Sequence, residues 1–85
     1  MNNIKNITVI GTGVIGTGWI LRFLAFNKKV TSYDPSYKQK NYLIKELGRT
    51  KSSIEKLYKK KINLRNLVFS SNLEDAVKHA DLIQE

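Results

Sequence analysis

The chain has 85 residues, enough for at most one small domain, and its hydrophobic content of 41% is that of a globular rather than a disordered protein. It contains no cysteine, which excludes disulfides, thiolate metal sites and a cysteine nucleophile, and one histidine, His79, which excludes a multi-histidine metal site. The net charge is +8, and ten of the 15 basic residues lie between Lys38 and Arg65.

The amino-terminal third predicts a strand, a glycine-rich turn and a helix. Residues 7–10 form a short apolar run rich in β-branched residues, which is typical of a buried parallel strand. A glycine-rich turn follows at residues 11–16, and a helical pattern runs from Val14 to about Phe26. Its apolar residues recur at spacings of four, four and three: Ile15, Trp19, Phe23 and Phe26. Residues 27–29 (Asn-Lys-Lys) end this helix, with cations at the end that the helix dipole favours.

The middle of the chain predicts a second strand and a long helix. The strand covers residues 30–33 and stops at Asp34-Pro35, where the proline suits the first turn of the following helix. The helix carries apolar residues at Leu43, Leu47, Ile54 and Leu57. Gly48 lies inside it and costs about 1 kcal/mol relative to alanine, so a break near Gly48 is possible.

The last third predicts two short strands around a short helix. Residues 67–70 form the third strand, and Asn72 is the expected N-cap of a helix whose last turn holds Lys78 and His79. Residues 82–84 begin a fourth strand. Strict alternation of strands and helices indicates right-handed crossovers and a parallel sheet. We therefore expect an α/β fold, a Rossmann-type parallel sheet with flanking helices, truncated to about four strands, as one domain over residues 1–85.

The glycine-rich turn matches the pattern G-x-G-x-x-G, with a predicted strand before it and a predicted helix after it. Its residues are Gly11, Thr12, Gly13, Val14, Ile15 and Gly16. Gly11 permits the tight turn, Gly13 lets the backbone approach a pyrophosphate, and Gly16 lets the helix pack closely on the strand. The N–H groups at the helix start then face the phosphates.

An acidic residue follows at the spacing that a dinucleotide site requires. Asp34 stands 18 residues after Gly16, at the end of the second predicted strand. A carboxylate there accepts hydrogen bonds from the adenine ribose and repels a 2′-phosphate, which favours NAD over NADP. FAD remains an alternative because flavin enzymes use a similar turn, and the nearby cations Lys38 and Lys40 leave NADP open. A glycine-rich corner without a ligand is the remaining interpretation.

Both ends of the chain resemble one family of dehydrogenases. The segment 7–35, with Gly-Val-Ile-Gly at 13–16, Trp19 and Tyr-Asp-Pro at 33–35, is similar to the NAD-binding domain of the 3-hydroxyacyl-CoA dehydrogenases. So are residues 73–77 (Leu-Glu-Asp-Ala-Val) and 80–85 (Ala-Asp-Leu-Ile-Gln-Glu). Trp19 and the Ile-Gln-Glu ending most resemble the L-carnitine dehydrogenase and lambda-crystallin branch. Residues 36–65 match only in their charged, helical character.

The resemblance implies an enzyme that oxidises a 3-hydroxy group to a 3-keto group with NAD. It implies that Val14 and Ile15 lie against the dinucleotide, that Asp34 binds the ribose, and that Glu85 lies near the nicotinamide half. The family's catalytic histidine and glutamate match no residue here, and His79 does not correspond to that histidine. We therefore expect no catalytic or metal-binding residue in this chain, which would be the amino-terminal part of a homodimeric enzyme and inactive alone.

The resemblance leaves the substrate and some competing functions open. L-carnitine is the leading substrate, and a 3-hydroxyacyl-CoA, whose phosphates crossover-helix lysines (Lys45, Lys51 or Lys56) would contact, is the alternative. A stand-alone dinucleotide-binding module without catalysis is a second possibility. The basic stretch raises nucleic-acid binding as a third, although a solvated helix face is the interpretation we favour. No signal peptide or membrane segment is visible in the sequence, so a cytoplasmic location is expected.

Overall fold

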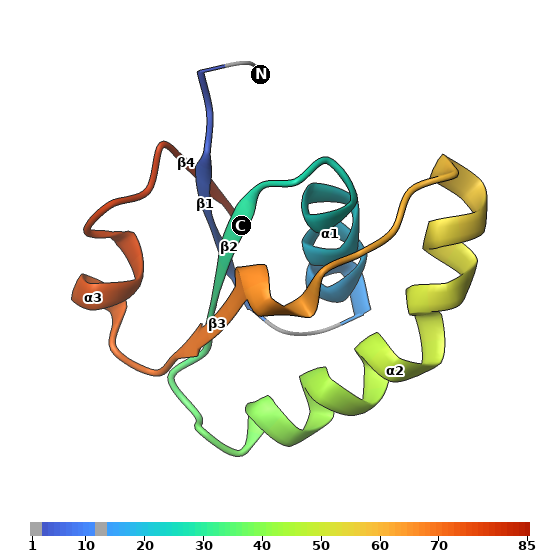
Figure 1. The fold of residues 1–85 in the computed structure, drawn as a ribbon. Helices are drawn as coiled ribbons and strands as arrows, with labels where there is room; N and C mark the ends of the chain where they lie inside the picture. Colours follow the sequence, from blue (N-terminus) through green and yellow to red (C-terminus); the bar gives the residue numbers. More distant parts are fainter. Residues whose placement is uncertain (1–2, 12–13) are drawn as a thin grey trace.

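The computed structural model describes residues 3–11 and 14–85, without the side chain of Val14. They form a four-stranded parallel sheet in the order β3-β2-β1-β4, flanked by helices (Figure 1). The expected α/β fold is therefore confirmed. The elements are β1 Asn6–Ile10, α1 Val14–Ala25, β2 Lys29–Tyr33, α2 Gln39–Tyr58, a short 3-10 helix η1 Leu64–Asn66, β3 Leu67–Ser70, α3 Leu73–Val77 and β4 Leu82–Gln84.

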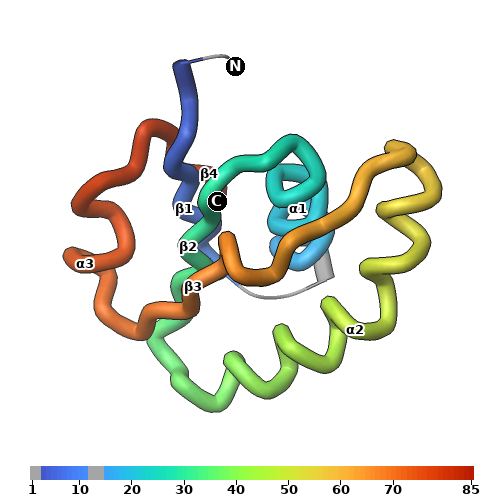
Figure 2. The backbone as a smooth tube through the Cα atoms, viewed as in Figure 1, coloured from blue at the N-terminus to red at the C-terminus, as the bar shows by residue number. Residues whose placement is uncertain are grey.

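The helices divide between the two faces of the sheet. In Figures 1 and 2, α1 and α2 lie on one side of the strands and α3 lies on the other. Successive side chains of a strand point to opposite faces, so alternate residues of β1 face the two helix layers in turn. Ile7 and Val9 are buried in the core cluster that includes α1 and α2, whereas the Thr8 hydroxyl donates a hydrogen bond to the Ala76 carbonyl of α3.

Helix α1 buries only part of the apolar stripe that the sequence predicted: Phe23 is 6% exposed and belongs to the core. Ile20, Leu21 and Leu24 are at most 1% exposed, whereas Ile15 is 77% and Trp19 38% exposed. Nearly every residue from 19 to 25 is apolar, so periodicity alone offered more than one stripe. The side that packs between the sheet and α2 was decided by tertiary contacts.

The end of α1 also differs slightly from the prediction. The helix stops at Ala25, and Phe26 lies beyond it with 46% of its surface exposed. Asn27 adopts a left-handed conformation with φ 61°, and the Lys28 N–H reaches back to the Phe23 carbonyl at 3.1 Å. This arrangement satisfies carbonyls that the helix end would otherwise leave unpaired.

Helix α2 starts later than expected and is not broken. It begins at Gln39, four residues after Pro35, so the proline lies in the preceding loop and not in the first helical turn. The helix continues through Gly48 without a gap, but its axis changes direction midway (Figure 1). The Thr50 hydroxyl donates to the Glu46 carbonyl at 2.8 Å, a contact that competes with the backbone bond and bends helices. Leu57 is 66% exposed and does not join the buried side of α2.

The carboxyl-terminal elements are fixed to β1 by local and long-range contacts. Asn72 caps α3 as predicted, because its side-chain oxygen accepts a bond from the Asp75 N–H at 2.9 Å. The helix itself ends at Val77, so His79 lies in the turn that follows. The Asp81 carboxylate accepts bonds from the N–H groups of Asn6 and Lys5, both at 2.9 Å, and these bonds lower the pKa of Asp81.

Candidate functional site

The carboxyl ends of neighbouring strands are joined by backbone hydrogen bonds. The Gly11 N–H, directly after β1, donates to the Tyr33 carbonyl at the end of β2 at 2.8 Å. The Asp34 N–H donates to the Ser70 carbonyl at the end of β3 at 3.2 Å. Gly11 therefore lies beside the residue that precedes Asp34. We call this side of the sheet, formed by Gly11, Asp34, Ser70 and the end of β4, the carboxyl edge.

The glycine loop makes a backbone contact that a side chain would prevent. Gly11 has φ +93°, a left-handed conformation that favours glycine. A Cβ atom on Gly16 would stand 2.4 Å from the Gly11 carbonyl oxygen and 3.2 Å from its carbon. The first turn of α1 thus packs directly on the loop backbone. Thr12 and Gly13, and the side chain of Val14, lie outside the described part of the chain, and Ile15 is exposed.

This close approach fits a dinucleotide phosphate group. Helix α1 starts at Val14, directly after the loop, so its amino end faces the carboxyl edge. The N–H groups of a first helical turn have no carbonyl partner within the helix, and the helix dipole makes that end positive. Such a helix end is a favourable place for a phosphate, and Gly11 and Gly16, the described glycines of the loop, carry no side chain there.

Asp34 is held by a turn that the sequence analysis did not single out. Its Oδ1 accepts a hydrogen bond from the Ser36 N–H at 2.9 Å. The side chain is half-buried at the end of β2. Aspartate readily forms such a bond to the backbone two residues on, so the Asp-Pro-Ser sequence carried a signal for this turn. The bond orients the carboxylate that was predicted to bind the ribose.

An aromatic and a lysine follow Asp34 closely in the sequence, Tyr37 in the loop before α2 and Lys40 in the first turn of α2. The Tyr37 ring meets the Phe69 ring of β3 edge-on, with centroids 5.6 Å apart. The Lys40 ammonium donates to the Tyr37 hydroxyl at 3.2 Å and lies 5.3 Å from the centre of that ring. Helical spacing gave no sign of Tyr37, because the residue precedes α2 and contacts a strand far along the sequence.

Glu85 lies on the opposite side of β1 from Asp34. Strand β4 pairs in parallel with β1, with Val9 opposite Gln84. The exposed residue after Gln84 is therefore at the carboxyl edge, next to the end of β1. Gly11 thus stands between Asp34 on the β2 side and Glu85 on the β4 side.

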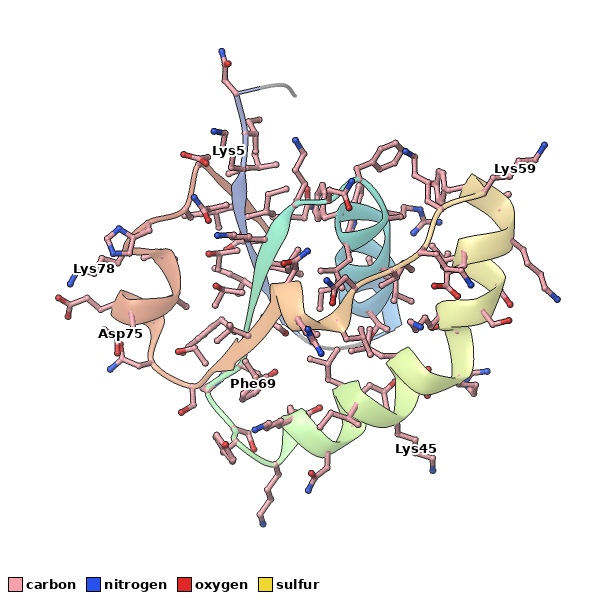
Figure 3. The ribbon with its side chains drawn as sticks, in the orientation of Figure 1. Lys5, Lys45, Lys59, Phe69, Asp75 and Lys78 are labelled. Carbon is pink, nitrogen blue, oxygen red and sulfur yellow. The ribbon has the colours of Figure 1, made fainter. Side chains whose placement is uncertain are left out.

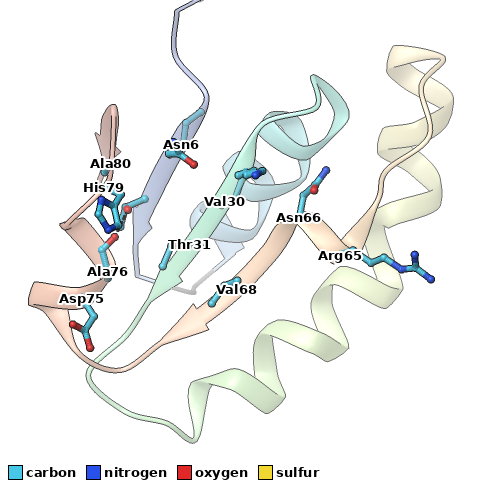
Figure 4. A pocket seen from close by; sticks show the side chains of 13 residues that line it. Asn6, Val30, Thr31, Arg65, Asn66, Val68, Asp75, Ala76, His79 and Ala80 are labelled. Carbon is cyan, nitrogen blue, oxygen red and sulfur yellow. Dashed lines mark hydrogen bonds between the residues drawn. The ribbon is translucent and has the colours of Figure 1, made fainter.

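His79 lies away from this edge. It borders a cavity of about 380 Å³ on the α3 face, which the amino-terminal parts of β1, β2 and η1 also line (Figure 4). Among the residues that the structure describes, no three His, Asp or Glu side chains gather as a possible metal site. No helix within residues 3–11 and 14–85 is long and apolar enough to cross a membrane.

Known proteins are similar to this chain in both sequence and fold. It is 45% identical over 82 residues to the L-carnitine dehydrogenase of Oceanobacillus iheyensis, covering 95% of this chain and 27% of that enzyme. The L-carnitine dehydrogenase of Staphylococcus epidermidis is 40% identical over 78 residues, covering 91% of this chain and 24% of the enzyme. The chain thus spans about a quarter of these relatives. A solved diketoreductase superimposes with a TM-score of 0.82 at 28% identity, over 98% of this chain and 31% of its own.

The sequence model of one protein family also matches nearly the whole chain. Residues 6–85 match the 3-hydroxyacyl-CoA dehydrogenase, NAD binding domain. The resemblance that the two ends of the sequence suggested is confirmed, and so is NAD as the coenzyme of this domain. The chain belongs to the 3-hydroxyacyl-CoA dehydrogenase family and corresponds to its NAD-binding domain.

Proposed function

We propose that the carboxyl edge binds NAD through the loop Gly11, Thr12, Gly13, Val14, Ile15 and Gly16, together with Asp34 and Glu85. The observation that carries this proposal is the hydrogen bond from the Gly11 N–H to the Tyr33 carbonyl. It holds the phosphate-binding loop against the strand end that carries Asp34. Pyrophosphate and adenine ribose are joined covalently in NAD, so their two binding groups must lie side by side.

Each group at the edge has a separate role in this proposal. Backbone N–H groups of the loop and of the first turn of α1 hold the pyrophosphate, with Val14 and Ile15 against the dinucleotide. The Asp34 carboxylate, oriented by the Ser36 N–H, accepts hydrogen bonds from the ribose hydroxyls. Glu85 faces the nicotinamide half. When bound, NAD supplies a hydride acceptor, and the residues of this chain bind and orient it.

We further propose that the chain is the coenzyme-binding part of an enzyme that oxidises the 3-hydroxy group of L-carnitine. The support is the identity of 45% and 40% to two L-carnitine dehydrogenases. The chain spans about a quarter of these relatives, and we propose that the catalytic acid and base lie in the part of the enzyme that it does not cover. We expect the whole enzyme to be a homodimer. A 3-hydroxyacyl-CoA is the alternative substrate, favoured by the family to which the chain belongs.

NAD binding can be tested with the purified protein. Trp19 is three residues after Gly16 on α1 and 38% exposed, so its fluorescence should respond to a ligand at the loop. We expect Asp34→Ala to weaken NAD binding about tenfold, since a charged hydrogen bond contributes about 1.5–3 kcal/mol. Glu74→Ala, an exposed carboxylate on α3, is the matched control and should leave the affinity unchanged. Equal NAD affinities for Asp34→Ala and the unmodified protein would contradict the assignment of Asp34.

The substrate proposal needs an activity assay. The longest natural protein that contains this chain would be incubated with NAD and either L-carnitine or a 3-hydroxyacyl-CoA, and NADH formation followed. We expect turnover of L-carnitine and none of the thioester. Activity confined to the thioester would replace L-carnitine by the alternative substrate and leave NAD binding unaffected.

A further inference from the structure

We propose that Lys40, held in place by Tyr37, is a second determinant of coenzyme specificity, whose ammonium group binds the 2′-phosphate of NADP. The carboxyl edge then accepts NADP as a weaker ligand than NAD, with Asp34 opposing the phosphate and Lys40 attracting it. This inference rests on the proposed NAD site and concerns the adenine-ribose end of that same site.

The chain between Asp34 and Lys40 is folded tightly at the end of β2. The Ser36 N–H bonds to the Asp34 carboxylate, the Gln39 N–H to the Ser36 carbonyl at 3.0 Å, and the Lys40 N–H to the Tyr37 carbonyl at 3.1 Å. These successive turns keep the first turn of α2 next to Asp34. The ribose 2′-hydroxyl that Asp34 is proposed to bind is the position that carries the extra phosphate in NADP.

Tyr37 contacts the Lys40 ammonium and favours one position for it. The tyrosine ring is anchored edge-on against Phe69 of β3, which pairs with Ser32 of the neighbouring strand β2. Its hydroxyl accepts one N–H of the ammonium at 3.2 Å. An ammonium has three N–H donors, so this bond leaves it able to meet a phosphate oxygen. A lysine that is already ordered loses less side-chain entropy on binding, which favours it over a freely moving neighbour.

Lys38 and Lys78 are the control residues with which Lys40 can be compared. Lys38 is two residues before Lys40 and is exposed. Among the described residues, its ammonium makes no contact like the one between Lys40 and the Tyr37 hydroxyl. Lys78 follows α3, on the other side of the sheet, and Figure 3 shows it pointing away from the molecule. If a diffuse positive field attracted NADP, neutralising either lysine would have the same effect as neutralising Lys40.

The experiment measures NAD and NADP affinities by calorimetry for the unmodified protein and for Lys40→Gln, Lys38→Gln and Lys78→Gln. The same three changes are then made together with Asp34→Ser, which removes the repulsion of a 2′-phosphate. We expect Lys40→Gln to weaken NADP binding about fivefold, as for an ion pair of about 1 kcal/mol, and to leave NAD binding within about twofold. Asp34→Ser should strengthen NADP binding, and Lys40→Gln should remove most of that gain. Tyr37→Phe, which keeps the ring on Phe69 but removes the hydroxyl, should produce part of the Lys40→Gln effect.

Two results would overturn the inference. One is equal NADP affinity of Asp34→Ser with and without Lys40→Gln. The other is an equal loss of NADP affinity in Lys38→Gln or Lys78→Gln, which would show a diffuse field. Failure of the proposed function is distinct, because it would appear first, as an absence of NAD binding by the unmodified protein.

Discussion

Replacing Gly16 by alanine tests whether the loop and α1 are as closely packed as the structure shows. The added Cβ atom would stand 2.4 Å from the Gly11 carbonyl oxygen, whereas ordinary contact begins at 3.4 Å. The start of α1 or the loop must therefore move by about 1 Å, and both neighbouring atoms belong to backbone that cannot rotate away. Forced overpacking of this kind costs about 1–3 kcal/mol.

Gly48 provides the matched control for this substitution. It lies inside α2, is exposed, and would have no atom within 4 Å of an added Cβ. Gly48→Ala should therefore stabilise the protein by about 0.5–1 kcal/mol, because alanine loses less backbone entropy in a helix. Both substitutions place alanine in a helix and gain its lower backbone entropy cost. The difference in free energy of unfolding between the two variants therefore reports mainly the clash at Gly16.

The assay is urea unfolding followed by circular dichroism, with NAD affinity measured on the same samples. We expect Gly16→Ala to unfold at a lower urea concentration than the unmodified protein and Gly48→Ala at a higher one. Displacement of the loop by about 1 Å should also weaken NAD binding by about tenfold or more, since charge-assisted bonds to phosphate depend on donor position. A Gly16→Ala variant as stable as Gly48→Ala, with unchanged NAD affinity, would refute the close packing on which the phosphate site depends.

Three further changes test how the fold is held together. Ser32→Ala should maintain thermal stability or raise it by up to about 1 kcal/mol, because the buried Ser32 hydroxyl has no hydrogen-bond partner among the described residues; a clear loss of stability would reveal one. Asn72→Ala should cost about 1 kcal/mol in urea unfolding through loss of the α3 cap, and an unchanged midpoint would contradict that role. Asp81 has a pKa below its ordinary value in the folded state, so its contribution is present at neutral pH and is lost as the pH falls through that lowered pKa. Asp81→Asn should therefore lower the melting temperature at neutral pH and flatten its decline in acid; parallel acid curves for the two proteins would count against this.

The sequence predicted the order of elements correctly because most strands and helices carry clear local signals. Residues 67–70 were predicted as a strand and form β3 with the same bounds, since apolar residues there stand between polar turns. The Asn72 cap was also predictable, because capping depends on a side chain and the backbone three residues later. The start of α2 was misplaced at Pro35, where the Asp34–Ser36 turn takes precedence over helix formation.

The candidate site was predictable in its backbone but less so in its side-chain contacts. The glycine spacing and Asp34 are local patterns, and the structure places Gly11 beside the residue that precedes Asp34. Contacts between residues distant in sequence, such as Tyr37 with Phe69, depend on the register of β3 against β2 and leave no periodic signal. Whether Thr12, Gly13 and the Val14 side chain contact the coenzyme remains a prediction from the motif.

The hydrogen bonds of Asp81 to the start of β1 have a consequence for the order of folding. They join residues 75 and 76 positions apart in the sequence, whereas β1 and β2 are separated by a single helix. Closing the longer loop costs more chain entropy, so β4 should dock after β1, β2 and β3 have assembled. Amide hydrogens of residues 82–84 should then exchange with solvent through local opening at a lower free energy than those of β1 and β2. A ligand that spans the ends of β1 and β4 should slow this exchange most at the strand that folds last.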